Sequence, residues 1–222
     1  MHIDKKEVLR YLGYRNGVID ANINLLIDEC INEAKEISDS KYIYKIFNID
    51  KSEERVRLLE SNLVFEGKDI LEHLEESSMC AVMAVTLGSN MDTKIRYYEK
   101  VSMTRALILD ACASVCVEWI CDEVQKEIRK EAQRKTLDIT YRYSPGYGDF
   151  LIDIQPKIIN ALDAQKNIGL TVTENNILIP RKSVSAVIGF QHKNMKAQHS
   201  GCKKCNKFIE CQYRKGGNHC GD

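Results

Sequence analysis

The sequence predicts an α+β fold: a mostly antiparallel sheet with flanking helices, one of them a long central helix, plus a short cysteine-rich C-terminal tail. Three observations support this prediction. Apolar residues recur at helical spacing from about residue 103 to 134, and a strand-like alternation follows directly at 137–143. The expected strands and helices do not alternate as the repeated βαβ units of a parallel sheet would.

The elements of the first half follow from local residue patterns. Apolar residues at helical spacing predict helices over 4–12 and 20–37. Aromatic and β-branched residues predict a strand over 42–49. Shorter apolar runs predict strands near 63–65 and over 81–87.

Three further helices are expected along this part of the chain. Asp69 is expected to cap a short helix over 70–76, because an aspartate accepts hydrogen bonds from the first N–H groups of a helix. The glycine at 88 leads into a helix near 92–100. The long helix carries one apolar face, which includes Leu109, Ala113, Cys116, Ile120, Val124 and Ile128. Cys112, Cys116 and Cys121 lie among apolar neighbours there, which predicts core packing rather than metal binding.

The last third begins with a strand that has two distinct sides. Apolar and aromatic side chains at 137, 139, 141 and 143 are expected on one side, with Asp138, Thr140 and Arg142 on the other. Pro156 suits the first position of a helix that runs to about residue 166 and ends before Gly169. Three short strands are then expected over 170–173, 177–179 and 183–188.

The stretch TYRYSPGYGDF at 140–150 predicts a ligand-binding turn. Pro145 and Gly146 suit the two central positions of a type II turn, and Gly148 lets a ligand approach the main chain. The Arg142 guanidinium can reach a carboxylate over the turn, and the Tyr147 ring suits a cationic or aromatic group. An ordinary surface loop with one arginine and one tyrosine explains the same residues equally well.

Residues 191–222 differ in composition from residues 1–190, which are expected to form one domain. The tail holds seven lysines and arginines against two acidic residues. It also holds Cys202, Cys205, Cys211 and Cys220, four thiols that can surround one tetrahedral centre. We expect an iron–sulfur cluster here ahead of zinc; a tail without metal is the alternative.

Composition excludes several classes of protein. The formal net charge is zero, so no overall field directs the chain to nucleic acid or to a membrane. No apolar run reaches the roughly 18 residues of a membrane span. The N-terminal residues lack the apolar core of a signal peptide, which predicts a cytoplasmic protein.

Three blocks, RYSPGY at 142–147, IGLTVTE at 168–174 and PRKSVS at 180–185, resemble the activation domain of cobalamin-dependent methionine synthase, in a free-standing form. The likeness extends more loosely over most of residues 1–190. It implies a subunit that binds S-adenosylmethionine and docks on a partner's oxidised cob(II)alamin, rather than an independent catalyst. One electron from a donor and the methyl group of S-adenosylmethionine would then regenerate methylcobalamin.

The resemblance also implies roles for individual residues. Arg142 would pair with the carboxylate of the ligand, Tyr147 would line the pocket, and the backbone of Ser144, Pro145 and Gly146 would contact the adenosine part. Glu174 would lie near the sulfonium, although capping a neighbouring turn explains it as well. Glu118 on the long helix resembles a pocket acid more weakly, and a surface role suits it better.

Two other functions remain open at this stage. One is a metal-binding adaptor for protein or nucleic acid that uses the basic cysteine tail. The other is an electron-transfer activator for a different corrinoid protein. The expected partner is therefore the cobalamin-binding part of methionine synthase or another corrinoid protein.

Overall fold

The computed structural model describes residues 1–14 and 19–192. A six-stranded sheet has the order β3-β2-β1-β4-β8-β5, and every neighbouring pair in it is antiparallel. A separate hairpin consists of β6 and β7. These features confirm the predicted α+β class and its mostly antiparallel sheet. The strands are β1 (Lys41–Lys51), β2 (Arg55–Leu58), β3 (Val64–Glu66), β4 (Ser77–Thr86), β5 (Leu137–Ile139), β6 (Thr171–Val172), β7 (Leu178–Ile179) and β8 (Ser183–His192).

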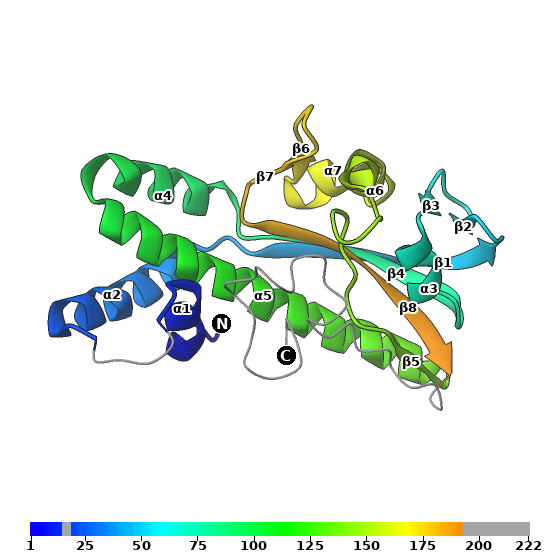
Figure 1. Ribbon diagram of the computed structural model, residues 1–222, viewed down its shortest axis with the longest axis horizontal. Helices are drawn as coiled ribbons and strands as arrows, with labels where there is room; N and C mark the ends of the chain where they lie inside the picture. Colours follow the sequence, from blue (N-terminus) through cyan, green and yellow to red (C-terminus); the bar gives the residue numbers. More distant parts are fainter. Residues whose placement is uncertain (15–18, 193–222) are drawn as a thin grey trace.

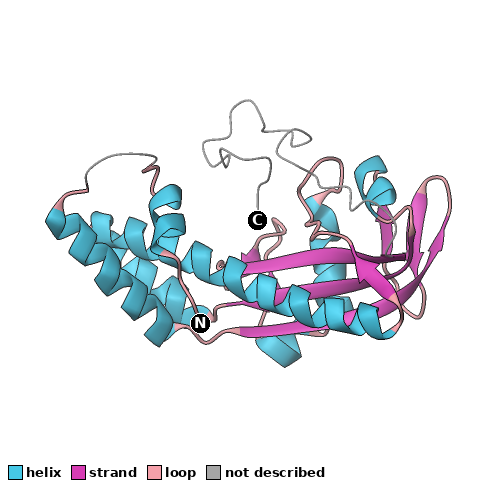
Figure 2. Cartoon of the chain, turned by 90° about the horizontal axis from the view of Figure 1, so that it is seen from below, coloured by secondary structure: helices cyan, strands magenta, loops and turns pink. Residues whose placement is uncertain are grey.

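Helices cover one face of the sheet, and shorter elements cover the other. The long helix α5 (Met103–Arg134) runs along the first face, as Figure 2 shows, with the predicted bounds. In Figure 1, α6 and α7 lie on the side of the sheet opposite α5. The helices are α1 (Lys5–Tyr11), α2 (Ala21–Ile37), α3 (Lys68–His73), α4 (Ser89–Val101), α5, α6 (Gln155–Ala161) and α7 (Ala164–Ile168), with a 3-10 turn at Ile152–Ile154.

Alternate residues of the central strands β4 and β8 point to two separate cores. Ala81, Met83 and Ile188 pack with the helical face, in a cluster that includes residues of α1, α2, α4 and α5. Val82 and Val187 pack in the second cluster, with residues of β2, β3, α3, α6 and α7. This alternation follows from the two-residue period of a strand. The cysteines at 112, 116 and 121 are buried, as predicted.

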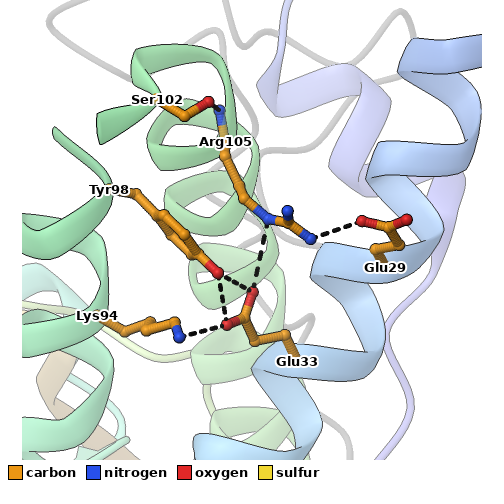
Figure 3. A network of polar contacts seen from close by, with 6 residues as sticks. All are labelled: Glu29, Glu33, Lys94, Tyr98, Ser102 and Arg105. Atoms are coloured by element: carbon orange, nitrogen blue, oxygen red, sulfur yellow. Dashed lines mark hydrogen bonds and ion pairs between the residues drawn. The ribbon is translucent and has the colours of Figure 1, made fainter. Parts of the chain in front are cut away.

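A polar junction joins three helices at the far end of the helical face (Figure 3). Glu33 of α2 accepts a hydrogen bond from the Tyr98 hydroxyl at 2.8 Å and pairs with Lys94 of α4 at 2.9 Å. Arg105 of α5 pairs with Glu29 at 2.6 Å and with Glu33 at 3.9 Å. These contacts fix the helices relative to one another.

The predicted strand over 137–143 is interrupted. β5 ends at Ile139, and only Tyr143 returns to the sheet, as an isolated bridge to Val187. The reason is Thr140, whose Oγ1 accepts the hydrogen bond of the Gly189 N–H at 2.8 Å in place of a backbone carbonyl. Leu137 and Ile139 pack in the core on the helical face, whereas Tyr143 packs in the second core, so the common side expected for these residues was wrong.

Three other expectations need correction. The short strand β2 was not predicted. The helix expected over 156–166 is divided into α6 and α7 at Asp163, which has a φ of 51°. Lys45 of β1 stabilises this break, because its ammonium donates to Ala161 O at 2.7 Å and contacts the Asp163 carboxylate at 3.0 Å. Asp69 does not cap its helix, which begins at Lys68.

Candidate functional site

The candidate ligand-binding turn at 144–147 has the predicted geometry. Gly146 has a φ of 92°, as the third position of a type II turn requires, and the Tyr147 N–H donates to Ser144 O at 3.3 Å. The Gly146 N–H donates to Phe150 O at 2.7 Å, which closes the loop onto the core. Tyr147 is 59% exposed, so more than half of this residue faces solvent.

Arg142 lies immediately before the turn and is held against α5. Its Nη1 contacts Asp122 Oδ1 at 2.6 Å and Gln125 Oε1 at 2.9 Å, and its Nη2 contacts Glu118 Oε2 at 3.0 Å. The arginine side chain is only 13% exposed, whereas those of Glu118 and Asp122 are 45% and 52% exposed. The side chains of α5 therefore hold the guanidinium in place, while the two carboxylates of Glu118 and Asp122 are partly exposed to solvent.

Electrostatics keep Arg142 charged in this setting. Burial opposes the charged form, but Cys121, Glu118 and Asp122 raise the pKa of Arg142 above its usual value. One cation beside two carboxylates leaves a local excess of negative charge. Such a site favours a ligand that carries cationic as well as anionic groups.

The turn is joined to α3, which lies about eighty residues earlier in the sequence. The Asp149 carboxylate accepts hydrogen bonds from the N–H groups of Lys68 at 2.7 Å and Asp69 at 3.0 Å. Asp149 is thus the N-terminal cap that Asp69 was expected to be. In return, Asp69 Oδ2 accepts the N–H of Asp149 at 3.2 Å.

Close backbone packing accompanies these hydrogen bonds. A side chain on Gly148 would collide with the Asp69 carboxylate, and one on Gly67 would meet the Asp149 backbone. Gly148 therefore admits a group of the protein itself, whereas a ligand was expected to take this approach. The turn is consequently held in place by contacts within the chain.

Tyr143 contacts the turn through its hydroxyl, and His73 packs against the Tyr143 ring. The two rings stack with their centroids 5.2 Å apart, and His73 Nε2 lies 3.0 Å from Thr140 Oγ1. Burial lowers the pKa of His73 to about 4, so the ring is neutral near pH 7. Burial, followed by the Asp69 charge, raises the pKa of Tyr143, so its hydroxyl stays protonated and donates to Tyr147 O at 3.2 Å.

The other predicted residues lie elsewhere. Glu174 is exposed in the turn between β6 and β7. This hairpin contacts the 3-10 turn at Ile152–Ile154, because Asn176 Nδ2 donates to Asp153 Oδ1 at 2.8 Å. Cys202, Cys205, Cys211 and Cys220 fall outside the described residues, so the metal-binding prediction stays a prediction. Within residues 1–14 and 19–192, no group of three or more histidine, cysteine or acidic side chains is placed to hold a metal ion.

One surface hollow lies apart from these residues. It has a volume of about 180 Å³ and is lined mainly by charged side chains of α4, α5 and the segment before β8, including Arg96, Asp110, Arg181 and Lys182. None of the residues expected to bind the ligand lines it. No helix in the described part of the chain has the length and apolar character to cross a membrane.

Sequence reasoning missed the residues that support the turn. Asp122 and Gln125 share the face of α5 that carries Glu118, and helical spacing was the only signal that pointed to them. Asp69 and Asp149 carried no local signal of their contact, because it joins segments far apart in the sequence.

One family model identifies the family of this chain, and a solved structure has a similar fold. A family model described as the activation domain of vitamin B12-dependent methionine synthase matches residues 60–215. The fold resembles the crystal structure of the MetH reactivation domain bound to AdoHcy, with a TM-score of 0.64, 15% sequence identity, and coverage of 88% of this chain and 72% of that chain. A search of curated proteins finds no match. Because the family model spans well over half of the sequence, the chain belongs to the family of vitamin B12-dependent methionine synthase activation domains.

Proposed function

We propose that the chain binds S-adenosylmethionine at the 144–147 turn and supports reductive remethylation of cob(II)alamin on a partner protein. The observation that carries the proposal is the charged arginine fixed beside a type II turn in a fold of this family. The crystal structure of the MetH reactivation domain, which has a similar fold, holds AdoHcy, a ligand with the same nucleoside and amino-acid groups.

Arg142 would bind the carboxylate of the ligand. A guanidinium has five N–H donors, and the contacts with Asp122, Gln125 and Glu118 use three. The remaining donors include the Nε–H, and a carboxylate prefers such a paired, charge-assisted contact. Because the three acceptors on α5 already orient the side chain, little further conformational freedom would be lost on binding.

The charges around Arg142 suit S-adenosylmethionine in particular. The ligand carries a carboxylate, an ammonium and a sulfonium, so its net charge is positive. Glu118 and Asp122 together with Arg142 have the opposite net charge, and both carboxylates are about half exposed. Loss of the methyl group removes the sulfonium charge, so this attraction would be weaker for the product.

A corrinoid-bearing partner would have to cover the turn, since the methyl group must reach the cobalt directly. Large apolar side chains with exposures from 37% to 66% surround the turn and the neighbouring hairpin: Tyr147, Leu151, Ile152, Ile177 and Ile179. Exposed apolar surface of this kind is typical of protein interaction sites. This chain would hold S-adenosylmethionine as the methyl donor and would release S-adenosylhomocysteine, while the partner's corrinoid and an external electron donor would supply the reduced cobalt that accepts the methyl group.

Isothermal titration with S-adenosylmethionine tests the proposal. Arg142→Ala should weaken binding about 100-fold, because a charge-assisted contact contributes about 3 kcal/mol. Arg105→Ala is the matched control: it also removes an arginine paired with two carboxylates, but at the distant helical junction. Equal affinity in the wild type and Arg142→Ala would exclude the carboxylate role. A wild-type chain that does not bind the ligand would exclude the proposed function.

A further inference from the structure

Asp69 and Asp149 form a reciprocal clamp between α3 and the loop that carries the candidate turn. Each carboxylate accepts hydrogen bonds from the other segment. The Asp149 carboxylate accepts hydrogen bonds from the N–H groups of Lys68 and Asp69, and the Asp69 carboxylate accepts one from the N–H of Asp149. The N-cap residue of α3 is Gly67, which has no side chain to cap the helix itself. Each segment therefore completes the hydrogen bonding of the other.

The clamp acts on the backbone at the point where the ligand turn ends. Asp149 follows Tyr147 by two residues, and Gly148 between them packs directly against the Asp69 carboxylate. The Tyr143 hydroxyl, which donates to Tyr147 O at 3.2 Å, also lies 3.5 Å from Asp69 Oδ2. Asp69 thus contacts the loop both after the turn and through the residue that follows Arg142.

We infer that Asp69 and Asp149 are positioning residues that hold the 142–147 segment in its ligand-binding conformation. This inference rests on the proposed function of the turn. Neither carboxylate is needed to contact the ligand: both are occupied by backbone N–H groups and act through the loop. Hydrogen-bond partners that orient metal ligands affect metal affinity about 10- to 100-fold when removed, and by analogy we expect about tenfold for these two residues.

A matched pair of cap deletions separates positioning from simple stability. Asp20, the N-cap residue of α2, accepts hydrogen bonds from the N–H groups of Asn22 at 2.9 Å and Ile23 at 3.2 Å, so it satisfies two helical N–H groups, as Asp149 does for α3. Asp149→Ala and Asp20→Ala should therefore lower the thermal midpoint of the full chain by similar amounts. Only Asp149→Ala should weaken S-adenosylmethionine binding, by about tenfold in isothermal titration.

Two further variants test the same inference if Asp149→Ala is too unstable to measure. Asp149→Asn keeps one oxygen acceptor, whereas Lys68 and Asp69 donate to two different oxygens of Asp149, so it should recover part of the affinity lost in Asp149→Ala. Asp69→Ala keeps the cap of α3 but removes the acceptor for the loop, so it should weaken binding like Asp149→Ala. Recovery by Asn, with loss in both alanine variants, supports positioning.

The outcomes distinguish this inference from the proposed function. Wild-type affinity in both Asp69→Ala and Asp149→Ala would overturn the positioning role, and the function of the turn would stand. An equal loss of affinity in Asp20→Ala would also overturn it, because the effect would then follow general stability. A wild-type chain that does not bind S-adenosylmethionine would overturn both.

Discussion

The two faces of the central sheet are covered in different ways. On the helical face, one 32-residue helix supplies most of the packing against alternate residues of β4 and β8. On the other face, short helices, a hairpin and two short strands together supply the residues of the second core. Their positions depend on contacts between distant segments, such as the buried hydrogen bond from Ser185 Oγ to Gln155 Oε1 at 2.6 Å. The candidate turn belongs to this second face, so its geometry depends on tertiary contacts more than on local sequence.

Removal of one large side chain from each face gives the largest expected effect. Phe150 and Leu109 are almost fully buried, and each truncation to alanine should lower the free energy of unfolding by about 3 to 5 kcal/mol. The rings of Phe150 and Tyr143 stack with their centroids 6.0 Å apart, and Phe150 is the last residue of the loop that carries the candidate turn. Leu109 packs in the core on the helical face. Denaturant titration should therefore give similar losses, while only Phe150→Ala should weaken ligand binding.

Equal affinity of Phe150→Ala and Leu109→Ala for S-adenosylmethionine would contradict the expected difference between the two faces. Phe150→Leu, a smaller change, allows the titration to be repeated if Phe150→Ala does not fold at the temperature of the experiment. Equal affinities would mean that the loop keeps its conformation without the packing of the second face.

Acid should act on the second face through His73. The pKa of His73 in the folded protein is about 4, below its usual value of about 6.5. The unfolded chain therefore binds a proton that the folded chain does not, and stability is lost as the pH falls from about 6.5 to 4. The full loss from this group is on the order of 3 kcal/mol. On the helical face, burial raises the pKa of Cys112 to about 12, so that thiol takes up no proton over this range.

His73→Gln isolates this contribution, because glutamine does not titrate and can still hydrogen-bond to Thr140. The free energy of unfolding, measured against pH, should fall less steeply in the variant between pH 6.5 and 4. The difference in slope should approach about 1.4 kcal/mol per pH unit. Parallel curves for the two proteins would show that His73 is not a buried neutral ring.

The same contrast explains how much of the molecule was predictable. The bounds of α5 follow from its own repeat of apolar residues, and the turn follows from Pro145 and Gly146. The strand β2 escaped prediction because its alternating run, RVRL, is only four residues long. The break after Ala161 depends on a lysine from β1, which no local pattern reveals.

The candidate site shows the same limit at the level of single residues. Arg142 could be chosen from its place before the turn, but its partners on α5 could not. The cap of α3 was expected from Asp69, the nearest suitable side chain in the sequence. Asp149 supplies it from eighty residues away. Local chemistry therefore predicts which groups are needed, and only the fold decides which residues provide them.

The smallest expected effect lies at the helical junction of Figure 3. Arg105 pairs with Glu29 and Glu33, and its guanidinium lies 5.3 Å from the centre of the Tyr98 ring. Its side chain is 30% exposed and that of Glu29 is 48% exposed, so water and salt screen the pair. Arg105→Ala should lower the free energy of unfolding by no more than about 1 kcal/mol. Denaturant titrations at low and high salt should show the difference shrinking as salt rises. A loss of several kcal/mol that salt does not change would mean that this junction, like the loop around Arg142, depends on desolvated charge.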